Sequence, residues 1–281
     1  MITTAEVATP SAVIDRVSLV LDTFGDAGRL TLAQIARRTG LPRTSVHRML
    51  DQLVQQRFLR RNGHGYELGM RLVELGSLAL HQDRLRRAAL PLLHELHRVT
   101  GLVVHLAVLE GPDVVYLEKI SDRLTTAIPT RVGGRQPAHC AAVGKAVLAY
   151  SEHQLGSIGE LTTKTRYSIT THTQLTAELA RVRARGIAFD REESIVGYGC
   201  VGAPVGPPSG AVAAVSVCGP MNRMRFDQRL AATVQMTAMG IWRNAERESG
   251  TVAPTLQKLR PLRAGPTSRR NPSADATLRY A

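Results

Sequence analysis

Apolar residues recur at helical spacing in the first part of the chain and predict three helices there. The first ends before Gly25, the second begins at Thr31 as its N-cap and ends at Thr39-Gly40, and the third follows Leu41-Pro42. Proline suits the start of a helix, where no backbone donor is needed. The three stripes are Val13, Ile14, Val17, Val20, Leu21 and Phe24; Leu32, Ile35 and Ala36; and Val46, Met49, Leu50 and Leu53.

A short hairpin follows the third helix. Residues 58–61 and 66–68 are predicted as strands, and the Gly-rich stretch 62–65 is predicted as the tip between them. Two helices joined by a tight turn and followed by a basic hairpin indicate a winged helix-turn-helix domain. We place this domain at residues 11–68, after a flexible lead of residues 1–10.

The polar face of the third helix favours DNA as the partner. Its first turns carry hydroxyls, an imidazole and arginines away from the apolar stripe, which suits reading of the major groove. The arginines of the hairpin suit backbone phosphates. An ordinary helical hairpin with a solvated polar face is the alternative, which the compound motif disfavours. The predicted DNA contacts are Arg43, Thr44, Ser45, His47, Arg48, Arg60, Arg61 and His64.

The remaining pattern predicts an α+β fold. Residues 69–81 form an amphipathic linker helix, which we expect to pair with a second copy because a lone apolar stripe needs a partner. Residues 82–250 read as an antiparallel sheet with helices on it, and residues 251–281 as a disordered basic tail. Strands are expected at residues 102–110, 114–120, 127–132, 187–191, 201–205 and 211–218, and helices at 83–100, 137–150, 173–185 and 226–248.

Composition agrees with a soluble, cytoplasmic protein. The chain has 281 residues, 43% of them hydrophobic, without a long apolar run or a signal-peptide pattern at the start. Its three cysteines are odd in number, distant in sequence and in no CxxC spacing. We therefore expect neither a disulfide framework nor a structural zinc site, and we expect no cofactor.

The net charge of +13 indicates a polyanionic partner, although the excess does not lie in the winged helix. Residues 1–80 hold 10 Lys or Arg against 7 Asp or Glu, whereas residues 251–281 hold 6 against 1. The DNA prediction therefore depends on the motif rather than on charge. The tail is either a second nucleic-acid contact or solvated disorder, and we favour disorder.

Three further segments resemble the IclR family of bacterial transcriptional regulators. They are residues 134–149 (GRQPAHCAAVGKAVLA), 185–193 (RGIAFDREE) with Gly197, Cys200 and 203–205 (APV), and 213–220 (AAVSVCGP). The run GLPRTSVHR at residues 40–48 also resembles the recognition helix of that family. Together these segments follow the family order from Ser11 to Glu248.

The resemblance implies a GAF-like effector-binding domain and a dimer or dimer of dimers on a palindromic operator of double-stranded DNA. It also implies a small organic or aromatic acid as effector, and repression as the commoner mode. The corresponding effector-binding residues are Ala142, Val143, Asp190, Cys200, Ser216 and Cys218. Ala142 stands where a glycine can occur in the family, and Cys218 where a serine can occur.

The residues also permit such a pocket without the resemblance. The helix expected at residues 138–150 offers backbone N–H groups to an anion at its beginning. Ser216 offers a hydroxyl, Cys200 a small semi-polar wall, and Asp190 a carboxylate that orients a substituent hydroxyl. A mostly apolar cavity with few polar anchors suits a small acid.

Several other motifs are weaker. Residues 197–202 spell GxGxxG, but the prolines that follow cannot open the helix that a dinucleotide site needs. His94 and His97 lie one helical turn apart without an evident third metal ligand. Cys200, His139 and Asp190 leave open a Cys-dependent hydrolase fused to a DNA-binding head, although no nucleophile motif surrounds Cys200.

Overall fold

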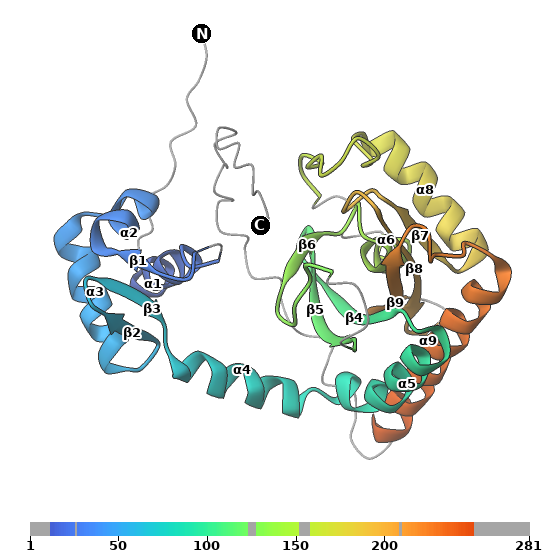
Figure 1. Ribbon diagram of the computed structural model, residues 1–281, viewed down its shortest axis with the longest axis horizontal. Coiled ribbons are helices and arrows are strands. Elements are labelled where there is room, and N and C mark those ends of the chain that lie inside the picture. Colours follow the sequence, from blue (N-terminus) through green and yellow to red (C-terminus); the bar gives the residue numbers. More distant parts are fainter. Residues whose placement is uncertain (1–11, 26, 123–127, 152–157, 208–209, 250–281) are drawn as a thin grey trace, which may run out of the picture. The chain divides into compact units, whose positions relative to one another are not determined.

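The computed structural model describes residues 12–25, 27–122, 128–151, 158–207 and 210–249. These residues fall into two compact units, which divide the chain between Gln82 and Asp83 (Figure 1). The predicted lead, the predicted tail and Ala127 lie outside the described residues. No helix in the described ranges is both long and apolar enough to cross a membrane.

The N-terminal unit is a winged helix-turn-helix domain, as predicted. Its three-stranded sheet has the order β1-β3-β2, and three helices pack on it around one apolar core. Its elements are α1 (Val13–Asp22), β1 (Leu30–Thr31), α2 (Leu32–Thr39), α3 (Arg43–Gln55), β2 (Leu59–Asn62), β3 (Gly65–Leu68) and α4 (Met70–Gln82). The buried core consists of Val20, Phe24, Leu30, Ile35, Leu41, Val46, Met49, Leu50, Leu53, Leu59 and Tyr66.

The turn between α2 and α3 follows from local sequence. Thr31 closes a capping box with Gln34, which satisfies free N–H groups at the start of α2. Gly40 ends that helix with a φ of +70°, a conformation that glycine adopts without steric cost. Thr31 also belongs to β1, where Leu30 pairs with Tyr66. This two-residue strand was not predicted, because it is visible only through its pairing with the wing.

Helix α4 differs from the others because it buries none of its residues within its own unit. Large apolar side chains are exposed along it, namely Met70 (63%), Val73 (61%), Leu75 (39%) and Leu78 (50%). Arg57 at the end of the helix-turn-helix forms an ion pair with Glu74, which connects α4 to the winged helix.

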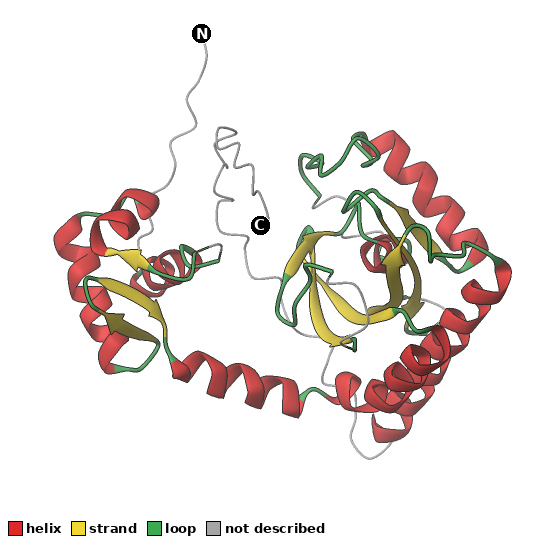
Figure 2. Ribbon diagram, viewed as in Figure 1, coloured by secondary structure: helices red, strands yellow, loops and turns green. Residues whose placement is uncertain are grey.

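The C-terminal unit is an α+β domain with a six-stranded antiparallel sheet in the order β6-β5-β4-β9-β8-β7 (Figures 1 and 2). The sheet curls around α6, while α5 and α9 lie side by side on its other face. The elements are α5 (Arg84–Thr100), β4 (Val103–Glu110), β5 (Asp113–Ile120), β6 (Arg135–Pro137), α6 (Ala142–Leu148), α8 (His172–Arg185), β7 (Ala188–Arg191), β8 (Tyr198–Val205), β9 (Ala213–Pro220) and α9 (Gln228–Ser249).

Alternating residues of the central strands separate the two faces. In β9, Val215 and Val217 pack in the core beneath α5 and α9, whereas Ala214 packs in the core around α6. Ser216 and Cys218 share the α6 face with Ala214 because successive side chains on a strand point to opposite faces. We call the side of the sheet that carries α6, Ser216 and Cys218 the α6 face.

The strand expected at residues 127–132 is wrong. Residues 128–132 form no strand, and β6 pairs with β5 instead. Pro129 cannot donate to a ladder. The carbonyls of Ile128 and Thr130 accept hydrogen bonds from Lys119 Nζ at 2.8 and 2.7 Å, so a side chain takes the place of a neighbouring strand.

The helix expected at residues 137–150 begins later than predicted, at Ala142. Pro137 lies in β6, and Ala141 is extended as the N-cap residue. The backbone N–H groups that we expected to bind an anion at the start of a helix over residues 138–150 were therefore predicted at the wrong position. The helix α6 that forms instead has only seven residues. The GxGxxG stretch enters β8 rather than a helix, as predicted.

A buried ion pair fixes α6 to the loop after β7. Lys145 is 1% exposed, and its Nζ lies 2.6 Å from both carboxylate oxygens of Glu193. The backbone carbonyl of Glu193 accepts from Ser168 Oγ at 2.7 Å. Burial raises the pKa of Glu193, and the Lys145 charge opposes that rise. The neighbour Glu192 has a φ of +64° and follows β7, which ends at Arg191, where the strand predicted at residues 187–191 also ends.

We predict that Glu193→Ala lowers the free energy of unfolding of this unit by about 3–5 kcal/mol, because it leaves the Lys145 ammonium buried without a partner. The double variant Lys145→Met/Glu193→Leu should recover most of the loss. Denaturant unfolding followed by the fluorescence of Trp242, the single tryptophan of the chain, measures both. Equal stability of wild type and Glu193→Ala would contradict the importance of the pair.

Candidate functional site

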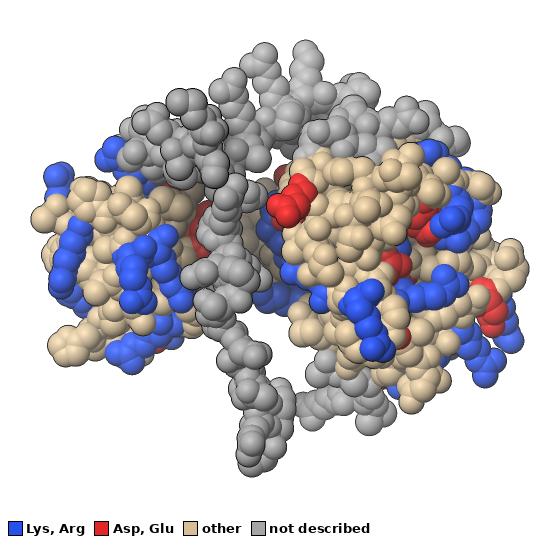
Figure 3. Space-filling view, turned by 90° about the horizontal axis from the view of Figure 1, so that it is seen from above, with Lys and Arg blue, Asp and Glu red and all other residues tan. Residues whose placement is uncertain are grey.

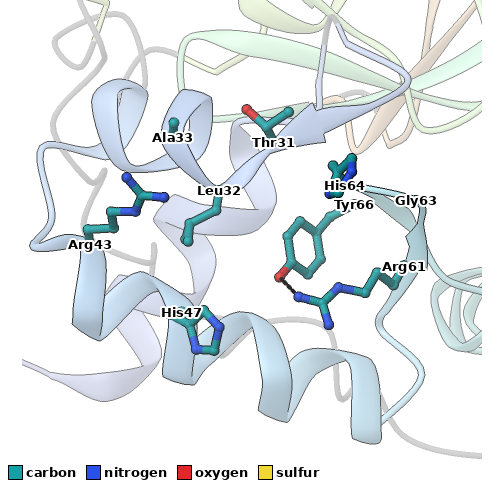
Figure 4. Close-up of a pocket in the computed structure, with 9 residues that line it drawn as sticks. All are labelled: Thr31, Leu32, Ala33, Arg43, His47, Arg61, Gly63, His64 and Tyr66. Atoms are coloured by element: carbon teal, nitrogen blue, oxygen red, sulfur yellow. Dashed lines mark hydrogen bonds between the residues drawn. The ribbon is translucent and has the colours of Figure 1, made fainter.

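The start of α3 and the tip of the wing border an open groove (Figure 4). Its volume is about 670 Å³. Arg43 and His47 reach it from α3, and Arg61 and His64 reach it from the wing. The groove is lined by Thr31, Leu32, Ala33, Arg43, His47, Arg61, Gly63, His64 and Tyr66. Four of the eight predicted DNA contacts therefore converge on one surface.

The predicted contacts on α3 lie on its solvent side. Arg43, Thr44, His47 and Arg48 are exposed, and Ser45 is half-buried. This arrangement follows from the helical period, because Val46, Met49, Leu50 and Leu53 are buried on the opposite side. His47 Nδ1 lies 3.0 Å from Asp51 Oδ2. Within the described residues, neither Arg43 nor Arg48 forms an ion pair, so both guanidinium groups are available to a ligand.

Two interactions order the arginines of the wing. Arg60 forms an ion pair with Glu67 at 2.6 Å, and Arg61 donates to the Tyr66 hydroxyl at 3.0 Å. A hydrogen bond from Asn62 and the charge of Arg60 lower the pKa of Glu67. Contacts within the hairpin thus restrict the positions of its two arginine side chains.

Arg29 is a basic residue of this region that sequence reasoning missed. Its Nη2 donates to the Asn62 carbonyl at 2.6 Å, and its side chain packs where a Cβ at Gly65 would lie. Its place in the loop before β1 gave no motif signal.

On the face of the N-terminal unit seen in Figure 3 (left), Lys and Arg groups outnumber acidic ones.

The second group of predicted residues meets on the α6 face. Cys200 of β8 pairs with Asp190 of β7 and with Cys218 of β9. Ser216 lies two residues from Cys218 on the same strand and pairs with Gly202. The structure therefore brings Asp190, Cys200, Ser216 and Cys218 together on one surface, although up to 28 positions separate them in the chain.

The two α6 residues of this group differ in position. Ala142 approaches the sheet closely, since a Cβ at Gly202 would lie 3.0 Å from its carbonyl carbon. Val143 packs in the core formed by α6, α8 and neighbouring strands. Its side chain therefore belongs to the domain interior. Both residues are nearly fully buried, at 2% exposure.

Cys200 and Cys218 form a disulfide, so the expectation of a chain without disulfides is wrong. They are 18 positions apart in sequence, and only the register of β8 and β9 places them opposite each other. Cys140 is the free, buried cysteine. The two sulfurs offer no S–H donor to a ligand while they are bonded to each other.

Asp190 has a structural task in the loop that follows it. Its carboxylate accepts from the Glu193 N–H at 2.7 Å and from the Ser194 hydroxyl at 2.5 Å. Burial raises its pKa, and the Ser194 hydrogen bond opposes that rise. It caps the turn that also presents Glu193 to Lys145.

The components of a Cys-His-Asp catalytic set do not act together in this structure. The Cys200 sulfur is bonded to Cys218, and His139 Nε2 lies 3.0 Å from the Thr162 carbonyl. Burial raises the pKa of the Cys140 thiol to about 12, which leaves it protonated and unreactive at neutral pH. His97 Nδ1 contacts the Leu102 carbonyl at 2.7 Å, and no cluster of three metal-ligating side chains occurs among the described residues.

These two surfaces define a class of protein: a transcriptional regulator with a winged-helix DNA-binding domain and a separate α+β domain. Family models identify it further. The IclR helix-turn-helix domain matches residues 13–63, and the bacterial transcriptional regulator IclR C-terminal domain matches residues 77–243. The chain belongs to the IclR family of transcriptional regulators, a non-enzymatic class.

Similarity to individual regulators extends over both domains. The transcriptional regulator XynR of Escherichia coli is 34% identical over 199 residues, which cover 68% of this chain and 79% of that protein. The transcriptional repressor IclR of Escherichia coli is 30% identical over 210 residues, which cover 72% of this chain and 77% of that protein. The transcriptional regulator BhcR of Paracoccus denitrificans is 32% identical over 227 residues, which cover 78% of this chain and 81% of that protein.

Solved structures of the family share the fold. An IclR homolog from Microbacterium hydrocarbonoxydans, complexed with 4-hydroxybenzoate, has a TM-score of 0.72 at 28% identity and covers 84% of this chain and 100% of its own. Thermotoga maritima IclR has a TM-score of 0.64 at 27% identity, and the match covers 83% of this chain and 98% of that chain.

We predict that Cys200→Ser lowers the free energy of unfolding of the C-terminal unit by about 3 kcal/mol under oxidising conditions, because the cross-link restricts the unfolded chain. The difference should vanish in dithiothreitol. Denaturant unfolding with Trp242 fluorescence tests this, with Cys140→Ser as a control that keeps the disulfide. A difference of the same size in reducing buffer would show that the bond is not its cause.

Proposed function

We propose that this protein is a ligand-responsive regulator that binds a palindromic operator as a dimer or a dimer of dimers, and that a small organic or aromatic acid is its effector. The observation that carries the DNA half is the groove beside α3. Arg43, Thr44, His47 and Arg48 are exposed at the N-terminal half of that helix, next to a wing that holds Arg61. This placement suits a recognition helix in the major groove with the wing on the backbone.

Dimerisation is inferred from α4. Four large apolar side chains on this helix are exposed, and no residue of it is buried. Burying them against the same helix of a second copy removes apolar surface from water and provides two DNA-binding heads. Two heads match two half-sites of a palindrome.

The effector half rests on the α6 face and on one relative. Ser216, Asp190 and the two cysteines meet beside α6, where Ala142 contacts Gly202. The homolog from Microbacterium hydrocarbonoxydans holds 4-hydroxybenzoate, which supports an aromatic acid as a ligand class for this chain. The acid acts by altering the separation of the two heads, and any such coupling is reciprocal. We favour repression, the mode named for the Escherichia coli relative.

Binding of the purified full-length protein to its own upstream intergenic DNA tests the proposal. Sequence-specific binding whose logarithm falls linearly with the logarithm of salt concentration is expected, since the arginines displace counterions from phosphates. Equal affinity for operator and unrelated DNA at all salt concentrations would contradict it. Truncation after Gly250 should leave the salt slope unchanged if the tail makes no contact.

We predict that Arg48→Ala weakens operator binding by about 1–3 kcal/mol and relaxes the preference at one base pair, because its guanidinium is free to reach a guanine. Binding to a library of single-base operator variants measures both effects. A uniform loss over all sequences would indicate a phosphate contact instead. Arg98→Ala is the matched control, since Arg98 is exposed in the other unit and pairs with Glu95 at 2.6 Å.

We further predict that Val73→Glu and Leu78→Glu shift the protein toward the monomer, because a charge at an apolar contact costs desolvation. Sedimentation velocity measures the mass, and DNA binding should weaken in parallel. His81→Glu is the control, because it adds the same charge to the same helix at a polar, exposed position. Unchanged mass of all three variants would show that α4 is not the interface.

A further inference from the structure

A row of three polar side chains crosses the α6 face and includes the predicted effector residue Ser216. Ser216 of β9 pairs with His105 of β4, and His105 pairs with Lys119 of β5. Directly opposed residues of antiparallel strands have Cβ atoms about 4.5–5.5 Å apart, so the three side chains are neighbours. A hydroxyl, an imidazole and an ammonium therefore stand side by side. We call them the Ser-His-Lys row.

His105 has an unused ring nitrogen. The residue is 1% exposed, and its Nε2 lies 2.8 Å from Thr130 Oγ1. Its Nδ1 is buried and has no hydrogen-bond partner in the described part of the chain. Burial, assisted by the Lys119 charge, lowers the pKa of His105 to about 3, so the ring is neutral at pH 7 and carries one N–H. A buried polar atom without a partner is costly and indicates a missing one.

The Lys119 ammonium has no carboxylate counterion in the part of the chain that the structure describes. Its Nζ donates to the carbonyls of Ile128 and Thr130, which leaves the third N–H of the ammonium. It forms no ion pair with a carboxylate among the described residues. Lys119 is half-buried, and this partial burial lowers the pKa of its ammonium. A partly desolvated cation gains most from an anion brought to it.

We propose that the Ser-His-Lys row is the carboxylate anchor of the effector site: the Lys119 ammonium, the His105 Nδ1–H and the Ser216 hydroxyl donate to the carboxylate of a small organic acid. The proposal rests on the proposed function, in which the α6 face binds such an acid. Nothing in the family resemblance assigns Lys119 or His105 to the ligand. The anchor uses the tautomer in which Nδ1 carries the ring proton, and in that tautomer Nε2 accepts from the Thr130 hydroxyl 2.8 Å away.

The disulfide explains why the anchor lies in this row. Cys218 occupies the position where a family serine can offer a hydroxyl, and its sulfur is bonded to Cys200. The next residue along β9 on the same face is Ser216, at one end of the Ser-His-Lys row. The row replaces the missing donor and adds a positive charge.

A purely structural role for the row is the competing explanation. Lys119 and His105 both contact the segment of residues 128–130 and could serve only to hold it. That role uses Nε2 and two of the three ammonium hydrogens. It leaves Nδ1 and the cation unexplained, which is why we favour a ligand.

Paired acid and amide probes test the charge. Calorimetric titration of the full-length protein with 4-hydroxybenzoate and 4-hydroxybenzamide, and with benzoate and benzamide, should show a preference for each acid of about tenfold or more. Lys119→Gln should abolish the preference by weakening acid binding alone. Lys164→Gln, which removes an exposed lysine of the same unit, should keep it. A preference retained in Lys119→Gln would overturn the proposal.

Two substitutions of His105 separate the ligand role from the structural one. The amide of asparagine lies near the position of Nδ1, and that of glutamine near Nε2. His105→Asn should keep acid affinity within about threefold, whereas His105→Gln should lose about tenfold. The reverse order of acid affinity would assign His105 to the Thr130 contact alone and overturn its part in the anchor.

Ser216→Ala provides the variant that leaves segment 128–130 untouched, should Lys119→Gln unfold. It should weaken both acids by more than it weakens either amide, because a carboxylate accepts more strongly than an amide carbonyl. Operator binding by the same proteins distinguishes failure of the carboxylate anchor from failure of the proposed function. If neither acid binds while operator binding persists, the anchor is overturned and the DNA-binding half of the proposed function stands. If operator binding is also absent, the proposed function itself fails.

Discussion

The register of the antiparallel pairs β8–β9 and β4–β9 is the constraint on which the C-terminal unit depends. A slip of one residue would move every side chain of a strand to the opposite face. The observed register opposes Cys200 to Cys218 and Ser216 to His105, and it buries Val215 and Val217 beneath α5 and α9. Apolar burial on one face thus fixes which polar groups meet on the other. The candidate ligand site is a by-product of how the core is filled.

In the N-terminal unit, too, burial of apolar residues determines which polar residues face solvent. There the apolar residues recur with the period of a helix rather than at alternate positions of a strand. Four apolar residues of α3 are buried, so Arg43, Thr44, His47 and Arg48 are turned to solvent. The wing joins that surface because β1 and β2 both pair with β3. The packed core is the means by which the polar face of the helix is presented to DNA.

Sequence predicted best what is determined locally. The helices of the N-terminal unit, the wing and the antiparallel α+β class follow from periodicity, capping and turn residues, and the structure confirms them. The errors concern long-range pairing. The segment 128–132 has strand-like composition, yet Lys119 takes its carbonyls, and β6 forms where only three residues pair.

The disulfide escaped prediction for the same reason, because cysteine spacing carries no information on strand register. Four of the six effector residues named from family resemblance, Asp190, Cys200, Ser216 and Cys218, meet on one face, whereas Val143 packs in the domain core. However, resemblance did not single out His105 or Lys119. Their significance lies in a buried ring nitrogen of His105 and a Lys119 ammonium that find no hydrogen-bond partner and no carboxylate, respectively, among the described residues, and three-dimensional packing alone determines such features.

We propose that DNA and a small acid bind this protein at two coupled sites. The most direct test is to measure the Kd for operator DNA with and without saturating 4-hydroxybenzoate, and the Kd for the acid with and without operator. We expect both constants to change by the same factor, since coupling free energy is reciprocal. Binding of both ligands with neither constant changed would contradict it.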